Sequence, residues 1–444
     1  MSRPDTTIEF IGAFESAYQP IFDVDNFEAT GHDRQWRADL DLLATAGVRR
    51  TRYPVRWHRV EGAPGAYDWR DVDAVLGWLQ DKNVDVIVDL LHHTSYPRWL
   101  NGFTDPRFGE AYLAYLEAFA RRYPEVRGYT LFNEPFTTFL LSGDVGIWPP
   151  HLQGLAGFTT IAKAVLPVVA EASRRFKDLL PNAEHVYVDS CERHVAGTGA
   201  AEEFTDFAND RRFFILDTFL GRAVGDDDRP FLRPFLEAGG EDLLAMEPGT
   251  LDVLGLDYYA HCQWEFIGAG GEGHMHTSRP DSLAWLMVEY AERYELPVIL
   301  GETNIRGYSS DRSSWLKYTL EQCEAARDAG IDVRGYCWFP FIDSCDWDSV
   351  LTEHNGNIDP VGVYWLDESR RRHRSCMSDV YTLAAGGVPS RELPAYRFRE
   401  PVATWLGGWL PQMSHWDWQD PPVYDTDPPM PVGPIELRIE DAVE

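Results

Sequence analysis

Basic residues are scarce in this sequence of 444 residues. Lysine and arginine together number 40, against 71 aspartates and glutamates, which gives a formal net charge of −31 at pH 7. Nucleic-acid binding depends on lysine and arginine to replace the counterions of phosphates, and anionic membrane surfaces attract the same residues. The charge therefore excludes nucleic acid as a partner and argues against a membrane surface. The excess of negative charge also favours a neutral ligand over an anionic one.

Long hydrophobic runs and paired cysteines are also missing. No uninterrupted apolar run reaches the ~18 residues that a membrane span needs, and the first residues, MSRPDTT, contain no basic stretch followed by an apolar one. We therefore expect no membrane span and no signal peptide. The six cysteines are scattered, without a C-x-x-C pair. They fit either reduced thiols in a cytoplasmic protein or disulfides in a secreted one, and we predict the cytoplasmic case.

The chain is rich enough in apolar residues to build a large core. Hydrophobic residues make up 44% of it and aromatic residues 13%, which excludes disorder of the whole chain. Short apolar runs alternate with longer amphipathic stretches. The runs, each predicted to form a strand, are 8–13, 48–53, 84–91, 128–132, 185–189, 251–258, 297–300 and 333–338. Helical periodicity occupies 70–80, 110–123, 162–180, 282–294 and 314–329.

This alternation indicates parallel strands joined by crossover helices. Eight runs favour a closed α/β barrel, the (β/α)8 or TIM barrel, over an open sheet, which would carry a glycine-rich first turn. We predict one barrel domain with long loops over residues 1–400. Residues 401–444, rich in tryptophan and proline, are predicted to form an extended arm. The arm would pack either on its own barrel or on a neighbouring subunit. The second arrangement would make the protein a homo-oligomer.

Two predicted strands lead into glutamates. The strand 128–132 precedes Glu134, and the strand 297–300 precedes Glu302. A single glutamate at a strand end is as often a member of a structural ion pair as a catalytic residue. Two glutamates on nonadjacent strands, however, predict a facing pair at the catalytic end of the barrel. Glycoside hydrolysis uses such a pair, because one carboxyl protonates the leaving oxygen and the other attacks the anomeric carbon. Arg52 is either a structural partner inside the barrel or the cation that keeps the attacking carboxylate ionised.

Other chemistries lack their usual patterns. The sequence has no G-x-S-x-G elbow, no phosphate-binding loop and no histidine, cysteine and carboxylate set at metal-ligand spacing. We predict neither a metal nor an organic cofactor. Because adjacent strand residues point to opposite faces, only one of His92 and His93 is expected to face the site.

Over most of residues 8–375 the chain resembles glycoside hydrolase family 1, a family of retaining β-glycosidases. The resemblance rests on six motifs in order along the chain: Phe10-Ile11-Gly12 with Ala17-Tyr18-Gln19, Arg52 with Trp57, Leu91-His92, Asn133-Glu134-Pro135, residues 254–259, and residues 335–347. It implies that Glu134 is the acid/base and Glu302 the nucleophile, with Arg52 and Tyr259 supporting the nucleophile. The residues that it implies for sugar binding are Gln19, His92, Asn133, Trp338, Asp346 and Trp347.

The sequence also departs from the family pattern. His93 stands where the family has tryptophan, Asp257 replaces an asparagine, and Asp346 replaces the glutamate that binds the glycone. Aspartate is one methylene shorter than glutamate, so its carboxylate need not reach the same sugar hydroxyls. We therefore expect the catalytic roles of the family in this chain, but not its specificity for glucose or galactose. The segments 90–93 and 133–138 resemble family-1-like barrels that some proteins carry fused to a dTDP-4-dehydrorhamnose reductase, whose glycine-rich nucleotide-binding turn does not occur in this sequence.

The sequence thus predicts a retaining, β-glucosidase-like hydrolase with a small saccharide or glycoside as substrate. It would cleave a β-linked glycoside or short oligosaccharide through a covalent glycosyl-enzyme intermediate. One alternative is a transglycosidase that uses the same residues. Another is a barrel that binds a saccharide without turning it over.

Overall fold

The computed structural model describes residues 8–223, 229–275 and 282–396. In this part of the chain, parallel strands close a barrel in the order β1-β15-β14-β11-β9-β8-β7-β4. The strands are β1 (Glu9–Ala13), β4 (Arg50–Pro54), β7 (Asp85–Asp89), β8 (Gly128–Thr130), β9 (Glu184–Ser190), β11 (Val253–Asp257), β14 (Val298–Glu302) and β15 (Val333–Trp338). Each lies on one of the predicted apolar runs, and the prediction of a (β/α)8 barrel is confirmed.

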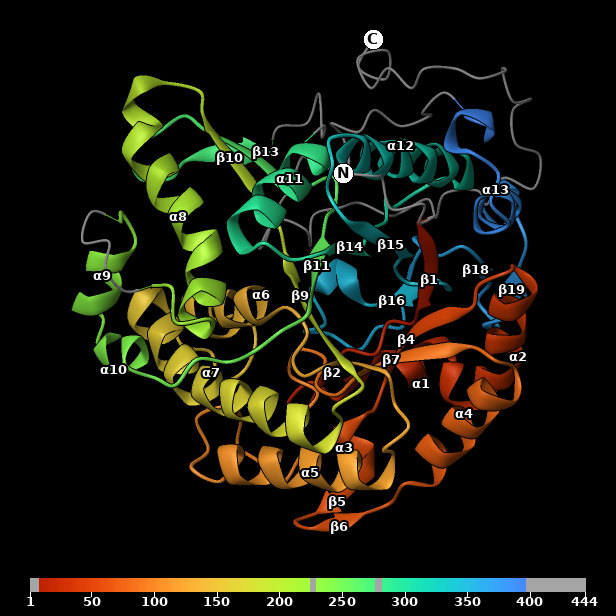
Figure 1. Cartoon of the computed structure of the whole chain (residues 1–444), viewed down its shortest axis with the longest axis horizontal. Helices are drawn as coiled ribbons and strands as arrows, with labels where there is room; N and C mark the ends of the chain where they lie inside the picture. Colours follow the sequence, from red (N-terminus) through yellow and green to blue (C-terminus); the bar gives the residue numbers. More distant parts are fainter. Residues whose placement is uncertain (1–7, 224–228, 276–281, 397–444) are drawn as a thin grey trace.

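A helix follows each barrel strand, and the helices surround the strands (Figure 1). These helices are α2 (His32–Thr45), α4 (Arg70–Asp81), α5 (Phe108–Arg122), α7 (Gly154–Leu179), α8 (Glu202–Phe219), α11 (Leu283–Tyr294), α12 (Ser309–Asp328) and α13 (Cys376–Ala385). Five of them coincide with the periodic stretches found in the sequence. The helices α2, α8 and α13 were not predicted.

The barrel strands are buried on both faces, which explains why they appear in the sequence as continuous apolar runs. Inward-facing side chains form one cluster inside the barrel: Ile11, Ala13, Ile87, Val186, Val188, Val253, Ile299, Cys337 and Phe339. Outward-facing side chains join the larger core under the helices. At Gly12, a Cβ atom would lie 2.0 Å from the Leu43 side chain of α2. Glycine at this position therefore lets the first helix pack directly on β1.

Shorter elements lie in the segments that connect the barrel strands and the main helices, and one follows α13. A three-stranded sheet of β10 (Arg193–Ala196), β12 (Gln263–Phe266) and β13 (Gly273–Met275) extends the loops after β9 and β11. The small helices are α1 (Asn26–Thr30), α3 (Trp57–Val60), α6 (Pro135–Phe139), η1 (Leu140–Asp144), η2 (Gly199–Ala201), α9 (Leu232–Glu237), α10 (Glu241–Leu244), η3 (Trp347–Ser349) and η4 (Ser390–Glu392). Two-stranded pairs form from β2 (Tyr18–Gln19) and β3 (Val24–Asp25), β5 (Glu61–Ala63) and β6 (Ala66–Tyr67), β16 (Ser344–Cys345) and β17 (Ile358–Asp359), and β18 (Trp365–Leu366) and β19 (Arg372–His373).

One helix, α7, is long and apolar enough to cross a membrane by length and composition alone. In the barrel it packs against α5, and 56% of its most apolar window is buried inside the protein. Its buried side chains, Phe158, Ile161, Val165 and Phe176 among them, belong to the main core. The apolar composition of α7 is therefore accounted for by its place in the outer layer.

The described residues include the six cysteines but not the predicted arm. All six cysteines are buried and free, in agreement with reduced core thiols, while the cytoplasmic location stays a prediction. The arm at 401–444, its packing and the homo-oligomer proposed from it lie outside the described residues. The boundary at residue 400 stays a prediction for the same reason.

A buried ion pair fixes the long loop after β15. Arg312 of α12 and Asp343 are both fully buried, with Nη1 of the arginine 3.2 Å from Oδ1 of the aspartate. Asp343 also accepts the backbone N–H groups of Gly362 (2.8 Å) and Leu366 (2.9 Å). Because the same loop carries Trp347 toward the barrel mouth, this cluster connects the outer layer to the site described below.

We expect Asp343→Ala to lower the free energy of unfolding by about 3–5 kcal/mol, because it leaves the Arg312 charge buried without a carboxylate. Urea denaturation of the wild type and of Asp343→Ala measures this difference in the free energy of unfolding. The control is Glu237→Ala, which breaks an ion pair whose side chains, Arg233 and Glu237, are 86% and 66% exposed, and should change the stability by less than about 1 kcal/mol. Equal effects of the two substitutions would contradict the structural role of Asp343.

Candidate active site

A cavity of about 200 Å³ opens at the carboxyl ends of the barrel strands. Both predicted catalytic glutamates, Glu134 and Glu302, border it. The rest of its wall comes from the segments that follow β1, β7, β8, β9, β11, β14 and β15, and apolar side chains predominate: Phe136, Leu140, Leu141, Ile305, Phe339, Val350 and Val361. The cavity wall therefore combines four carboxyl groups, those of Glu15, Glu134, Glu192 and Glu302, with apolar surface that strengthens electrostatic interactions.

Glu302, the last residue of β14, is held at both carboxylate oxygens. Arg52 of β4 donates from Nη1 to Oε1 at 2.8 Å, and the Tyr259 hydroxyl donates to Oε2 at 2.7 Å. Burial, the largest effect, raises the pKa of Glu302 above its usual value, and the charges of Arg52 and His92 and the two hydrogen bonds oppose this rise. Arg52 and Tyr259 thus stabilise the ionised form of Glu302 against the effect of burial, and their role as supports of a nucleophile stays a prediction.

Glu134 follows β8 and precedes α6. Its backbone has a positive φ of 46°, and its N–H donates to the Val188 carbonyl of β9 at 3.0 Å. Asp189 accepts the N–H of Phe136 at 3.0 Å, which fixes the first turn of α6. Burial raises the pKa of Glu134 well above its usual range, and the negative charges of Glu302 and Asp189 raise it further. The surroundings of Glu134 thus favour its protonated form.

Of the two adjacent histidines, only His93 borders the cavity, as predicted, whereas His92 contacts Asp89 and Glu15 beside it. The strand β7 ends at Asp89, and His93 has a positive φ of 51°, so strand alternation does not apply here. His93 borders the cavity with Nε2 3.6 Å from Oε2 of Glu134. Burial lowers the pKa of His93 well below its usual value, and the His92 and Arg52 charges add to this effect. His93 is therefore a neutral neighbour of Glu134.

Several residues predicted to bind the sugar have polar atoms available. Among the described residues, no hydrogen-bond partner is present for either side-chain polar atom of Gln19 or for Nδ2 of Asn133, although all are buried. The Asn133 Oδ1 accepts a hydrogen bond from Arg52 Nη2 at 2.6 Å. His92 Nδ1 lies 2.7 Å from the Asp89 carboxylate. Buried polar atoms normally have partners, so these groups fit a polar ligand.

Trp338 and Asp346 are two predicted sugar-binding residues that end or follow β15, and neither borders the cavity. Trp338 is fully buried in the main core, and its indole N–H donates to the Val361 carbonyl at 2.9 Å. Like Gln19, His92 and Asn133, it does not border the cavity, and its assignment to sugar binding stays a prediction. Asp346 also does not border the cavity, and its Oδ1 accepts the N–H of Asn357 at 2.9 Å. Its Oδ2 is buried and has no hydrogen-bond partner within the described residues.

The family profile described as "Glycosyl hydrolase family 1" matches residues 13–266, more than half of the chain. The chain belongs to glycosyl hydrolase family 1. It is an O-glycosyl hydrolase of β-glucosidase-like type. The recognition that the sequence motifs allowed is thus confirmed.

The relatives of this family 1 hydrolase are distant. It is 22% identical over 379 residues to the aryl-phospho-beta-D-glucosidase BglC of Bacillus subtilis, covering 72% of this chain and 79% of the relative. It is 20% identical over 384 residues to beta-glucosidase A of Thermotoga maritima, covering 78% and 83%. A solved structure of a Thermotoga maritima beta-glucosidase in complex with methyl acetic acid-substituted glucoimidazole has a TM-score of 0.74 at 16% identity, covering 87% of this chain and 98% of that one. This structural likeness supports the fold alone.

Sequence reasoning missed Glu15 and Asp189 in this family 1 site. Glu15 borders the cavity and lies inside the first family motif, between Gly12 and Gln19, where a charged residue among small and aromatic ones was the available signal. Asp189 is the penultimate residue of β9 and contacts α6. A polar residue at the carboxyl end of a barrel strand was its signal.

We expect Tyr259→Phe to raise the pKa of Glu302 by about 1–2 units, since a hydrogen bond to a charged group is worth ~1.5–3 kcal/mol and one unit equals ~1.36 kcal/mol. In the pH profile of kcat/KM for glycoside hydrolysis, the acidic limb then moves to higher pH. The matched control is Tyr258→Phe, because the Tyr258 hydroxyl donates to Gln263 at 3.0 Å. An acidic limb that stays in place in Tyr259→Phe, or moves equally in both variants, would contradict this role of Tyr259.

Proposed function

We propose that this protein is a retaining β-glycosidase that hydrolyses a β-linked glycoside or short oligosaccharide through a covalent glycosyl-enzyme intermediate. Glu302 is the nucleophile and Glu134 the acid/base. The observation that supports this assignment best is the unequal environment of the two carboxyls: Glu302 receives hydrogen bonds from Arg52 and Tyr259, and Glu134 lies beside the neutral His93. An ionised nucleophile and a protonated acid are the two states that the first step requires.

In the first step, an oxygen of Glu302 attacks the anomeric carbon while Glu134 gives its proton to the glycosidic oxygen. The bond between the anomeric carbon and that oxygen breaks, and the aglycone leaves as a neutral alcohol. In the second step, Glu134, now ionised, takes a proton from water as the water oxygen attacks the anomeric carbon. Glu302 is released as a carboxylate, and the two displacements together retain the β configuration.

The glycone would lie at the inner end of the cavity. We assign its hydrogen bonds to Gln19, His92, Asn133 and Trp347, and to the Oδ2 atom of Asp346. Arg52 and Tyr259 position the nucleophile without contacting the leaving group. The apolar wall would hold the aglycone and limit the access of water to the intermediate.

Trapping with activated 2-deoxy-2-fluoro-β-glycosides tests the proposal. A panel of 2,4-dinitrophenyl glycosides is incubated with the full chain, and intact-mass and peptide mass spectrometry locate the label. We expect one glycosyl group per chain, attached to Glu302, because the fluorine slows the second step more than the first when the leaving group is activated.

Two variants sharpen this experiment. Glu302→Gln should take up no label, whereas Glu134→Gln should still be labelled, because dinitrophenolate leaves without a proton. Label on any other residue would contradict the assignment of the nucleophile. A folded wild-type protein that takes no label and cleaves no glycoside in the panel would favour the saccharide-binding alternative, and transfer to an added sugar would favour the transglycosidase.

A further inference from the structure

Glu15 is a further carboxylate at this cavity, and the proposed chemistry gives it no role. It lies between β1 and β2 and is only 5% exposed. It borders the same cavity as Glu134 and Glu302. A buried carboxylate is costly unless donors surround it, so its contacts define what it does.

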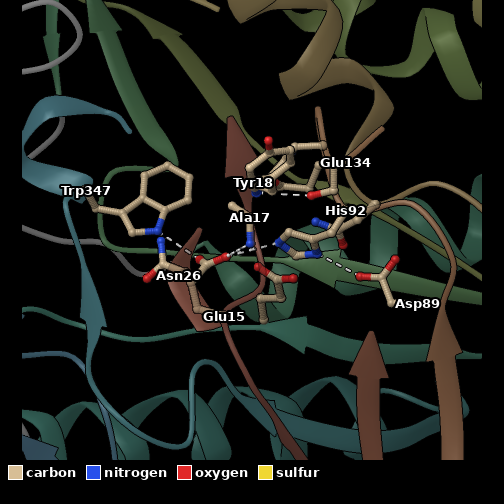
Figure 2. Close-up of polar contacts among 12 residues, drawn as sticks. Glu15, Ala17, Tyr18, Asn26, Asp89, His92, Glu134 and Trp347 are labelled. Carbon is tan, nitrogen blue, oxygen red and sulfur yellow. Dashed lines mark hydrogen bonds and ion pairs between the residues drawn. The ribbon is translucent and has the colours of Figure 1, made fainter. Parts of the chain in front are cut away.

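Two of these contacts are with the side chains assigned to the glycone. Trp347 donates its indole N–H to Oε2 of Glu15 at 2.8 Å, and Nε2 of His92 lies 3.4 Å from Oε1. The backbone N–H of Ala17 donates to Oε1 at 2.7 Å. In Figure 2, Glu15 lies between Trp347 and His92, and Asp89 lies on the other side of His92. Glu15 therefore lies directly beside two side chains, Trp347 and His92, that are assigned to the glycone.

The charges at this end of the cavity do not cancel. Burial opposes a charge on His92, but the carboxylates of Asp89 and Glu15 raise its pKa to about 10. His92 is therefore a cation between two carboxylates. With Glu302 and Arg52 included, three carboxylates face two cations, which leaves one negative charge. Burial raises the pKa values of Glu134 and of the nearby Asp257 well above their usual range, so these two carboxyl groups are counted as neutral.

In the part of the chain that the structure describes, the three cations Arg52, His92 and Arg306 each have a carboxylate partner. Arg52 pairs with Glu302, and His92 lies between Asp89 and Glu15. Arg306, the arginine of the cavity wall, pairs with Asp359. A phosphate or carboxylate on the glycone would meet Glu15 at close range and would have to compete with these carboxylates for a cation.

We propose that Glu15 is a specificity-determining residue: it accepts a hydrogen bond from a glycone hydroxyl and rejects glycones that carry a phosphate or carboxylate. The proposal rests on the proposed function and names its substrate class, an uncharged glycone. One relative carries the name aryl-phospho-beta-D-glucosidase, so the distinction separates two substrate classes within the curated relatives.

Kinetics of the full chain test the proposal with three substrates: 4-nitrophenyl β-D-glucoside, its 6-phosphate and 4-nitrophenyl β-D-glucuronide. We expect wild-type kcat/KM to be at least a hundredfold higher for the neutral glucoside than for either anionic substrate. Glu15→Gln keeps the shape and removes the charge, so it should reduce this ratio at least tenfold. Glu15→Asp keeps the charge but shortens the side chain. It should therefore still discriminate against the anionic substrates, and its kcat/KM for the neutral glucoside should be lower than that of the wild type.

The matched control is Glu192→Gln, which removes a carboxylate from another part of the same cavity wall. Its substrate ratio should stay within about threefold of the wild type. An unchanged ratio in Glu15→Gln would overturn the proposal, and so would an equal reduction in Glu192→Gln, because the overall charge of the cavity would then be the cause. Circular dichroism establishes that each variant is folded.

A binding measurement separates this proposal from the proposed function. Calorimetry on Glu302→Gln and on the double variant Glu15→Gln/Glu302→Gln uses glucose, glucose 6-phosphate and glucuronate, and requires no turnover. We expect glucose to bind at least tenfold more tightly than either anion to the first protein, and this preference to shrink in the second. Equal affinities in the first protein, or binding of none of the three sugars, would overturn the role of Glu15, whatever the trapping experiment shows about Glu302.

Discussion

The site depends on one buried charge, the guanidinium of Arg52. Arg52 is 3% exposed and contacts Glu302, the Asn133 side chain and, at 3.6 Å, Asp89. These partners follow or end three other strands, β14, β8 and β7, and only the closed order of the barrel brings them to β4. A buried charge without its partners would cost several kcal/mol. Barrel closure and the ionisation of Glu302 therefore stabilise each other.

The position of this cation decides how the other charges divide. The carboxylate nearest to Arg52, Glu302, is the one favoured as an anion, and Glu134 then sits in a buried environment facing a negative charge. Because His93 beside Glu134 is neutral, it provides no positive charge that would lower the pKa of Glu134. On the opposite side, His92 is held charged by two carboxylates, one of which is Glu15. The same arrangement thus gives the catalytic pair its asymmetry and gives the glycone end its negative charge.

Much of this was predictable from sequence, because buried parallel strands appear as continuous apolar runs and the two strand-end glutamates follow directly from them. The predictions failed where polar side chains are buried, because helix prediction relied on apolar residues being buried and polar residues being exposed. The helix α12 begins five residues before its predicted start, because the polar residues 309–313 are buried. The helix α8 buries Arg212 and Asp217, so its apolar periodicity is weak. His93 and Glu15 owe their roles to a positive φ and to contacts between distant loops, which no local pattern encodes.

The central claim, that the single proton of the catalytic pair resides on Glu134, is open to direct measurement. Titration of the full chain labelled with ¹³C at the glutamate carboxyls, followed by NMR, gives the individual pKa values, and the resonances missing in Glu134→Gln and Glu302→Gln assign the pair. The account predicts that Glu134 has the higher pKa, well above the ordinary value of ~4.3, and that this pKa falls in Glu302→Gln, where the opposing charge is lost. A higher pKa at Glu302 than at Glu134 would contradict it.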